Sequence, residues 1–263
     1  MKAAKPKKNS VAIKPTTYQN PHAITIGKSK AAAVIFKALT LLILLLTAPI
    51  ITAHAQTTVV ELFTTSACAA CDPADAIIQS LTTDQAKDTI ILTCHVAFMG
   101  NATTNDDIPL KACDKRHTMY YRAKILQRPS TPIAVINGIH EITATKDHMM
   151  RSGLAMAQST TQVKTLNITR TSNHIQTTLP DITLKNPADI VLITYAPNET
   201  TLTKSSGKEK TYTHLVKDVQ HIQTWDGLNQ DLKIDLNPAH PENTYALIAQ
   251  KKNGTILAAG KFD

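Results

Sequence analysis

The stretch FTTSACAACDPAD, from Phe63 to Asp75, decides how the rest of the chain is interpreted. It places two cysteines, Cys68 and Cys71, between a strand pattern and a helix pattern. The preceding residues 57–65 are rich in β-branched side chains, which favour a strand. The following residues 73–86 carry apolar side chains at helical spacing and begin with a proline, which suits the first helical position. The stretch could hold a redox pair, half of a metal site, or two small residues in a turn.

Strand and helix patterns alternate through the residues that follow. A continuous apolar run at 88–98 is typical of a strand buried in a parallel sheet. Asn137 and Gly138 form a hairpin signal between two short strand patterns. The predicted elements are strands at 57–65, 88–98, 131–138 and 140–144, and helices at 73–86, 109–126 and 146–158. Their order along the chain is β-α-β-α-β-β-α.

The character of the chain changes after about residue 160. Short runs with strong β-propensity alternate with turn formers, and Asn253-Gly254 indicates another hairpin. This pattern is typical of an all-β sandwich. The sequence therefore predicts an α/β domain at 56–160 and a smaller all-β, sandwich-like domain at 161–263.

Positive charge is concentrated in the first segment, residues 1–55. This segment holds eight lysines and no acidic residue, so the rest of the chain has 20 basic residues, what remains of 28, against 20 acidic ones. The formal charge of +8 therefore belongs to the first segment. Because the body is near neutral, the charge gives no argument for a nucleic-acid partner.

The first segment has the pattern of a signal peptide with a long basic n-region. An apolar run at 38–51 precedes Ala53-His54-Ala55, and cleavage is expected before Gln56. The run is short for a membrane span, which needs about 20 residues. The expectation is an exported protein, periplasmic or secreted. The alternative is an uncleaved N-terminal anchor, which would place the protein at a membrane.

The position of the cysteine pair at the start of a predicted helix favours thiol-disulfide exchange. The helix N-terminus lowers the pKa of a cysteine, and the thiolate is the reactive form. An exposed first thiolate attacks a partner disulfide, and a shielded second thiol resolves the mixed disulfide. On this interpretation Cys68 is the nucleophile and Cys71 resolves. The expected partners are protein thiols and disulfides, with no cofactor and no metal.

Thr131 and Pro132 open the third predicted strand. The β-α-β-α-β-β-α order with Thr-Pro at this place is the thioredoxin arrangement. In that arrangement Pro132 is expected to follow a cis bond, face the cysteine pair and bind the backbone of a partner. The alternative is an ordinary proline at the start of a strand.

The chain resembles the secreted, thioredoxin-like domain-of-unknown-function-1223 family. The likeness is carried by VVELFTTSACAACDPADAII, CHVAF, RHTMYYRAKILQRPSTPIAVING, IVLITYAP and YTHLVKDVQHIQTWDG. It implies a thioredoxin-like domain followed by a β-rich domain, and no known substrate. The chain departs from the family pattern at Asp72, where proline is expected, and at Ser130, where an aromatic residue is expected. Cys94 and Cys113 are not part of the pattern either.

Two carboxylates near the pair have competing interpretations. Glu61 could lie beneath the pair and accept the proton of the resolving thiol, because burial raises the pKa of a carboxyl. It could equally be an edge or solvent-facing glutamate. Asp72 opposes thiolate formation at the pair and also favours the helix start.

Cys94 and Cys113 have three interpretations. The favoured one is a structural disulfide between the second strand and the second helix. A second redox pair is another. The third is a metal site in which these two cysteines join Cys68, Cys71, His95 and His117, since Cys113 and His117 are four residues apart. Met149 and Met150 are expected in the core rather than as copper ligands.

The sequence thus predicts an exported thiol-disulfide oxidoreductase or redox-partner protein, with enzymatic activity left open. Its site residues are Cys68, Cys71, Pro132 and Glu61. The alternative is a metal- or copper-binding protein, or a thioredoxin-like binding protein without catalysis. Trp225 and Tyr212 are expected to pack the core of the all-β domain.

Overall fold

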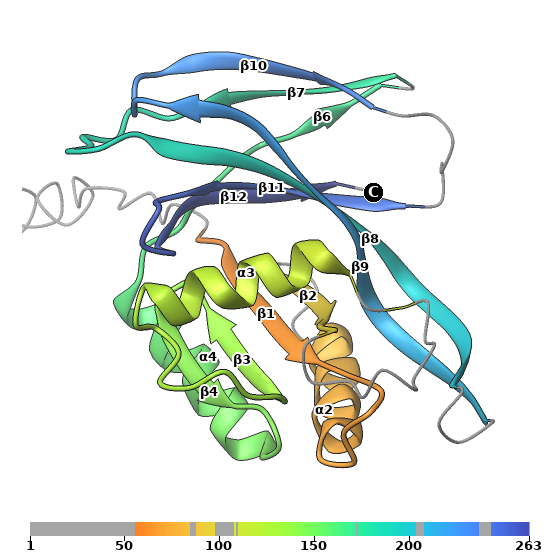
Figure 1. Cartoon of the computed structure of the whole chain (residues 1–263). Coiled ribbons are helices and arrows are strands. Elements are labelled where there is room, and N and C mark those ends of the chain that lie inside the picture. The colour runs from red at the N-terminus through yellow and green to blue at the C-terminus, as the bar shows by residue number, and fades with distance from the viewer. Residues whose placement is uncertain are drawn as a thin grey trace, which may run out of the picture. The chain divides into compact units, whose positions relative to one another are not determined.

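A computed structural model describes residues 56–84, 88–97, 108, 110–171, 173–203, 208–236 and 243–262. The predicted signal peptide or anchor at 1–55 lies outside these residues. Among the described residues, no helix is both long and apolar enough to cross a membrane. The structure is mixed α/β, with one large sheet and few helices (Figure 1).

The predicted order of the first seven elements matches the observed one. The strands are β1 (Thr58–Thr64), β2 (Thr89–His95), β3 (Ile133–Ile136) and β4 (His140–Thr143), and the helices are α2 (Cys71–Asp84), α3 (Lys111–Arg122) and α4 (Asp147–Thr160). Strand β1 lies between β2, to which it is parallel, and β3, to which it is antiparallel. Both β1 and β2 are buried along their whole length, as their apolar and β-branched composition predicts.

The side chains of β1 alternate between two cores. Val60 and Leu62 pack with α2 and α4, whereas Val59 and Phe63 pack with residues of α3. Because successive side chains of a strand point to opposite faces, this alternation assigns a face to every residue of β1. Helices α2 and α4 thus cover one face of this part of the sheet, and α3 covers the other.

The later strands do not form a separate sheet system. They are β5 (Lys164–Thr165), β6 (Thr169–Arg170), β7 (His174–Leu179), β8 (Ala188–Thr203), β9 (Lys208–Trp225), β10 (Gln230–Asp235), β11 (Thr244–Gln250) and β12 (Ile256–Phe262). The large sheet has the order β4-β3-β1-β2-β9-β8-β11-β12-β5, and β10-β7-β6 form a second sheet. The described residues from 56 to 262 form one compact unit. The two predicted segments therefore share a sheet across the expected boundary near residue 160.

Packing between the two sheets is sandwich-like. Leu192 of β8 and Leu247 of β11 pack against Ile175 of β7 and Leu232 of β10. Trp225 is fully buried in this cluster, as expected, and its Nε1 donates a hydrogen bond to the Leu228 carbonyl at 2.8 Å. One face of β8 and β11 thus packs against strands, as the β-rich prediction for residues after 160 implies. Their other face packs toward α3, which the prediction did not include.

Strands β8 and β9 form an unusually long antiparallel ribbon. They have 16 and 18 residues and stay paired from Ala188–Trp225 to Thr203–Lys208. Figure 1 shows them running side by side from the level of the smaller sheet down past helix α2. Helix α2 contacts β9. The ribbon thereby brings residues near 210 to the start of α2.

Candidate functional site

The cysteine pair lies where the chain turns from β1 into α2. The backbone N–H of Cys71 donates to the Cys68 carbonyl at 2.9 Å, which closes a turn, and α2 begins at Cys71. Cys68 is half-buried, Cys71 has no exposed surface, and both are free thiols. The geometry thus places the first cysteine within reach of a partner and the second behind it.

Burial changes the proton affinity of Cys71. It raises the pKa of the Cys71 thiol to about 11, with a further increase from the neighbouring Cys68 and smaller decreases from Thr64 and Thr65. Cys71 is therefore protonated at neutral pH. A thiol in this state is a poor nucleophile until a nearby group removes its proton.

Pro132 lies next to the pair. The Thr131–Pro132 peptide bond is cis, and Cys68 Sγ is 3.9 Å from the Thr131 carbonyl oxygen. Strand β3 begins directly after this proline, at Ile133. The structure therefore brings together three of the predicted site residues, Cys68, Cys71 and Pro132.

Glu61 does not lie where either interpretation placed it. It is 1% exposed, so it is not solvent-facing. Its two oxygens accept hydrogen bonds from Arg116 of α3 at 2.6 and 2.7 Å, and the Tyr120 hydroxyl donates to it as well. The physical reason is strand alternation: Glu61 shares the α3 face with Val59 and Phe63, whereas the pair precedes α2 on the other face. The expected role as proton acceptor beneath the pair is a misassignment, because both carboxylate oxygens belong to this ion pair.

Cys94 and Cys113 form a disulfide that joins β2 to α3, with their Cα atoms 5.4 Å apart. This is the pairing that the sequence favoured. Both cysteines belong to the core on the α3 side. A bridge between cysteines 19 residues apart is expected to stabilise the fold by about 3 kcal/mol in the chain-entropy model.

The disulfide also bears on the alternative metal site. Two of the six proposed ligands are bonded to each other and so cannot bind a metal as thiolates. His117 is buried, which lowers its pKa, and its Nε2 lies 3.3 Å from the Ser130 carbonyl oxygen. In the described part of the chain, no three His, Cys, Asp or Glu side chains are grouped to hold a metal ion. Met150 is buried as expected, but the expected core position is wrong for Met149, which is 38% exposed.

Sequence reasoning missed Lys210 and Asp75. Lys210 of β9 reaches α2 and binds Asp72 at 2.5 Å and Asp75 at 2.7 Å. Two acids in the first turns of a helix are a recognisable signal, since they suit the helix N-terminus. The lysine carries no comparable signal, because it comes from a strand 135 residues later than Asp75.

The charges around Lys210 are mutually dependent. Burial alone would lower its pKa, but the hydrogen bonds that Lys210 donates to Asp72 and Asp75 outweigh this and raise the pKa above its ordinary value. Burial raises the pKa of Asp75, and Lys210 partly opposes that increase. Lys210 Nζ also lies 4.8 Å from the centre of the Tyr212 ring. Tyr212 in turn packs edge-on against His95 of β2, so it belongs to this site rather than to the core around Trp225.

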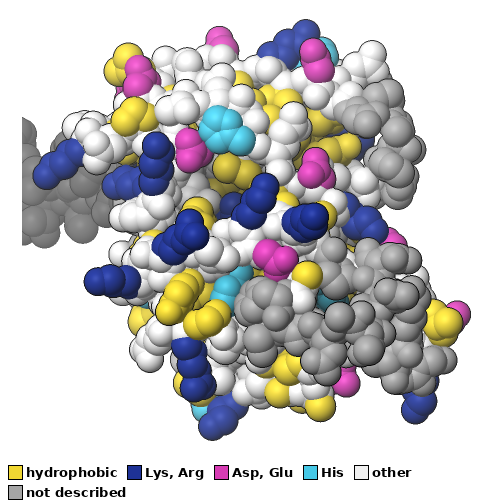
Figure 2. All heavy atoms as spheres, in the orientation of Figure 1, with side chains coloured by type: hydrophobic (Ala, Val, Ile, Leu, Met, Phe, Trp, Pro, Cys, Tyr) yellow, Lys and Arg dark blue, Asp and Glu magenta, His cyan; other side chains and the backbone are white. Residues whose placement is uncertain are grey.

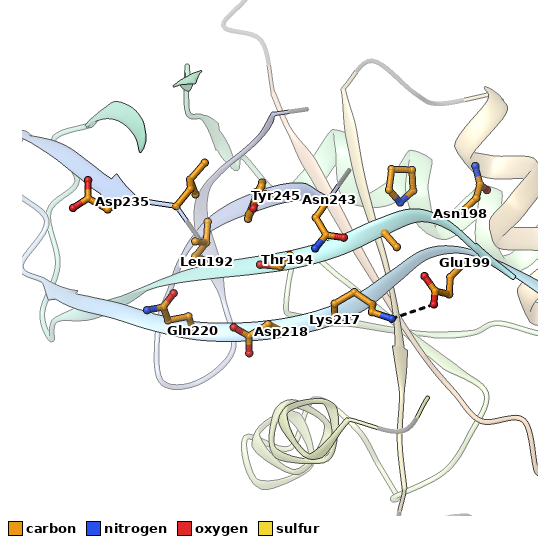
Figure 3. Close-up of a pocket in the computed structure, with 13 residues that line it drawn as sticks. Leu192, Thr194, Asn198, Glu199, Lys217, Asp218, Gln220, Asp235, Asn243 and Tyr245 are labelled. Atoms are coloured by element: carbon orange, nitrogen blue, oxygen red, sulfur yellow. Dashed lines mark hydrogen bonds and ion pairs between the residues drawn. The ribbon is translucent and has the colours of Figure 1, made fainter. Parts of the chain in front are cut away.

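Two hollows lie away from the cysteine pair. One, of about 760 Å³, is lined by β8, β9 and β11 and holds a Lys217–Glu199 ion pair at 3.2 Å (Figure 3). A smaller one, of about 570 Å³, lies beside α3, where Lys115, Arg122 and Lys252 line it. Figure 2 shows basic side chains gathered across the middle of this face with acidic ones among them. None of the predicted site residues lines either hollow.

These features define a class: a mixed α/β protein with an accessible thiol and a buried thiol at a helix start, and a cis proline beside them. The chain belongs to the family described as protein of unknown function (DUF1223), which matches residues 59–250. A comparison with curated proteins found no match.

Two solved structures are similar to this one. The crystal structure of protein AGR_C_4864 from Agrobacterium tumefaciens is 23% identical, with a TM-score of 0.67 over 79% of this chain and 94% of that one. HBP35 of Porphyromonas gingivalis is 13% identical, with a TM-score of 0.51 over 80% of this chain and 76% of that one. At these identities the likeness concerns the fold alone.

Proposed function

We propose that the protein is an exported thiol-disulfide oxidoreductase, or the redox partner of one, that works through a reversible Cys68–Cys71 disulfide. The observation that carries the proposal is the joint position of three residues. Cys68 is half-buried at the helix start, Cys71 is fully buried behind it, and Cys68 Sγ lies 3.9 Å from the carbonyl before the cis Pro132. An accessible thiol and a shielded one are what the two steps of disulfide exchange require.

Residues 56–160 are proposed to be a thioredoxin-like unit. The element order from β1 to α4 and the cis bond before β3 support this assignment. In such a unit, the backbone next to the proline pairs with an extended segment of the partner while the disulfide is exchanged, which is a form of strand addition. The Cys94–Cys113 bridge suits an oxidising compartment outside the cytosol, which is why we propose export.

The proposal is tested by trapping. Replacing Cys71 with serine is expected to leave Cys68 joined to its partners as stable mixed disulfides, because the resolving thiol is gone. The matched control is Cys68→Ser, which keeps the same number of thiols but removes the accessible one. Non-reducing gel electrophoresis followed by mass spectrometry of the adducts from the exported fraction measures the difference.

The outcomes are unambiguous. Adducts that depend on Cys68 and dissolve on reduction support the proposal. Equal amounts of adduct with both variants contradict it. So does the absence of adducts from both variants, if Cys68 in Cys71→Ser still reacts with a small disulfide.

A further inference from the structure

A protonated, buried Cys71 needs a base, and Glu61 cannot serve. Asp75 lies four residues after Cys71, so the two side chains share one face of α2. The side chain of Asp75 is only 10% exposed. The carboxylate is thus a buried acid on the helix face that carries the resolving thiol.

The Thr64 hydroxyl lies between the two groups. Thr64 ends β1 on the α2 face, as alternation from Val60 and Leu62 requires. It is close enough to both Cys71 and Asp75 to lower the pKa of each. Thr64 Oγ1 and Asp75 Oδ1 are both buried. A hydroxyl both donates and accepts hydrogen bonds, so one that interacts with a thiol and with a carboxylate can pass a proton between them.

Lys210 holds the other side of the same carboxylate. Its Nζ binds Oδ2 of Asp75 at 2.7 Å, so the lysine contacts the carboxylate through that oxygen. The charged groups facing Asp75 are therefore Lys210 from β9 and Asp72 from its own helix. Opposite charges this close keep a buried carboxyl ionised, and an ionised carboxylate can accept a proton.

We propose that Asp75 is the proton acceptor for Cys71, that the Thr64 hydroxyl relays the proton, and that Lys210 of the β8–β9 ribbon keeps Asp75 ionised and in place. The inference rests on the function proposed above and assigns its second step. It also gives the long ribbon a role, because β9 supplies the lysine.

The chemistry balances with a protein disulfide as co-reactant. The Cys68 thiolate attacks one partner sulfur, the partner S–S bond breaks, and the other sulfur leaves as a thiolate that takes a proton from water. Cys71 then passes its proton to Asp75 and its sulfur bonds to Cys68 Sγ. The bond from Cys68 to the partner breaks, and the second partner sulfur leaves as a thiolate. Two electrons have moved from the pair to the partner, and Asp75 returns its proton to water; the reverse sequence oxidises a partner dithiol.

The two steps can be followed separately with 5,5′-dithiobis(2-nitrobenzoate) on the full chain, with the Cys94–Cys113 bridge intact. Attack by Cys68 releases one coloured thiolate, and attack by Cys71 on the mixed disulfide releases a second. Asp75→Asn is expected to slow the second release by at least about 100-fold, the usual contribution of a general base, and to leave the first unchanged. Thr64→Val is expected to slow the second release in the same direction. The matched control is Asp84→Asn, which removes an exposed acid at the opposite end of α2 and is expected to leave both releases near wild type.

The pH profile separates a proton acceptor from a structural residue. In the wild type, the second release is expected to be nearly independent of pH between the pKa of Asp75 and that of Cys71, because the fraction of reacting pairs is constant there. In Asp75→Asn it is expected to rise in proportion to hydroxide, because the thiol must then ionise alone. An unchanged second release, or equal slowing of both releases, overturns the inference.

Failure of the proposed function is distinguishable from failure of this inference. If the wild type gives one release only, Cys71 does not resolve and the function fails. Asp75 is then judged in the Cys68→Ser background by ultraviolet titration of the Cys71 thiolate. Removing the neighbouring negative charge with Asp75→Asn is expected to lower the apparent pKa of Cys71. An identical titration in both proteins overturns the coupling.

Discussion

Replacing Arg116 with methionine is expected to lower the free energy of unfolding by about 3–5 kcal/mol, the cost of breaking a buried ion pair on one side. The side chains of Arg116 and Glu61 are 7% and 1% exposed, and they share two short hydrogen bonds. Without the guanidinium, the Glu61 carboxylate stays buried and keeps the hydrogen bond that the Tyr120 hydroxyl of α3 donates to it. Urea unfolding of the two proteins measures the difference.

Two further variants identify the cause of that loss. Arg151→Met removes an arginine whose ion pairs with Asp84 and Asp147 are largely exposed, so its loss of stability is expected to be much smaller. Glu61→Leu combined with Arg116→Met removes both charges and is expected to recover much of the lost stability. If Arg116→Met lowers the free energy of unfolding no more than Arg151→Met does, the buried Glu61–Arg116 ion pair does not contribute to stability as we expect.

The second large effect concerns the reactivity of the two thiols. Cys68→Ser leaves Cys71 as the free thiol, and the pKa of Cys71 is about 11. Burial is the largest cause of this raised pKa and remains when Cys68 is replaced, so Cys71 keeps little thiolate at neutral pH. Because only the thiolate reacts and Cys71 has no exposed surface, alkylation of Cys68→Ser by iodoacetamide is expected to be at least about 10-fold slower than alkylation of Cys71→Ser.

Cys68→Ser and Cys71→Ser serve as controls for each other. Each keeps one thiol of the site, and the Cys94–Cys113 bridge removes the other two cysteines from the reaction. Mass spectrometry of the alkylated protein over time gives both rates. Faster labelling of Cys71 than of Cys68 would reverse the assignment of nucleophile and resolving thiol.

The cysteine pair and the proline were predictable because their signals are local. Two cysteines between a β-branched run and a helical run, and Thr-Pro before a strand, are visible in short windows of sequence. The ion pair of Glu61 with Arg116 was not predictable, because the face of a strand residue depends on which helix packs there. Val60 and Leu62 lie on the α2 face, so Glu61 between them lies on the α3 face.

Lys210 could not be predicted because its position depends on the length of one ribbon. Pro197 and Asn198 lie inside β8, yet both residue types usually end a strand, so the sequence favoured shorter strands. The pairing of Asn198 with Thr213 and of Thr201 with Lys210 carries β9 as far as α2. The same long-range pairing explains why strands from both predicted domains share one sheet.

The central claim is that Cys68 and Cys71 form a reversible disulfide, and a redox titration tests it most directly. The full chain is equilibrated in buffers of increasing ratio of oxidised to reduced glutathione, quenched with acid, alkylated and mapped by mass spectrometry. We expect a two-electron transition in which a Cys68–Cys71 linkage appears with increasing oxidation, while Cys94 and Cys113 stay linked throughout. If Cys68 and Cys71 stay unlinked to each other across the whole range, or Cys94 and Cys113 are the pair that titrates, the account is contradicted.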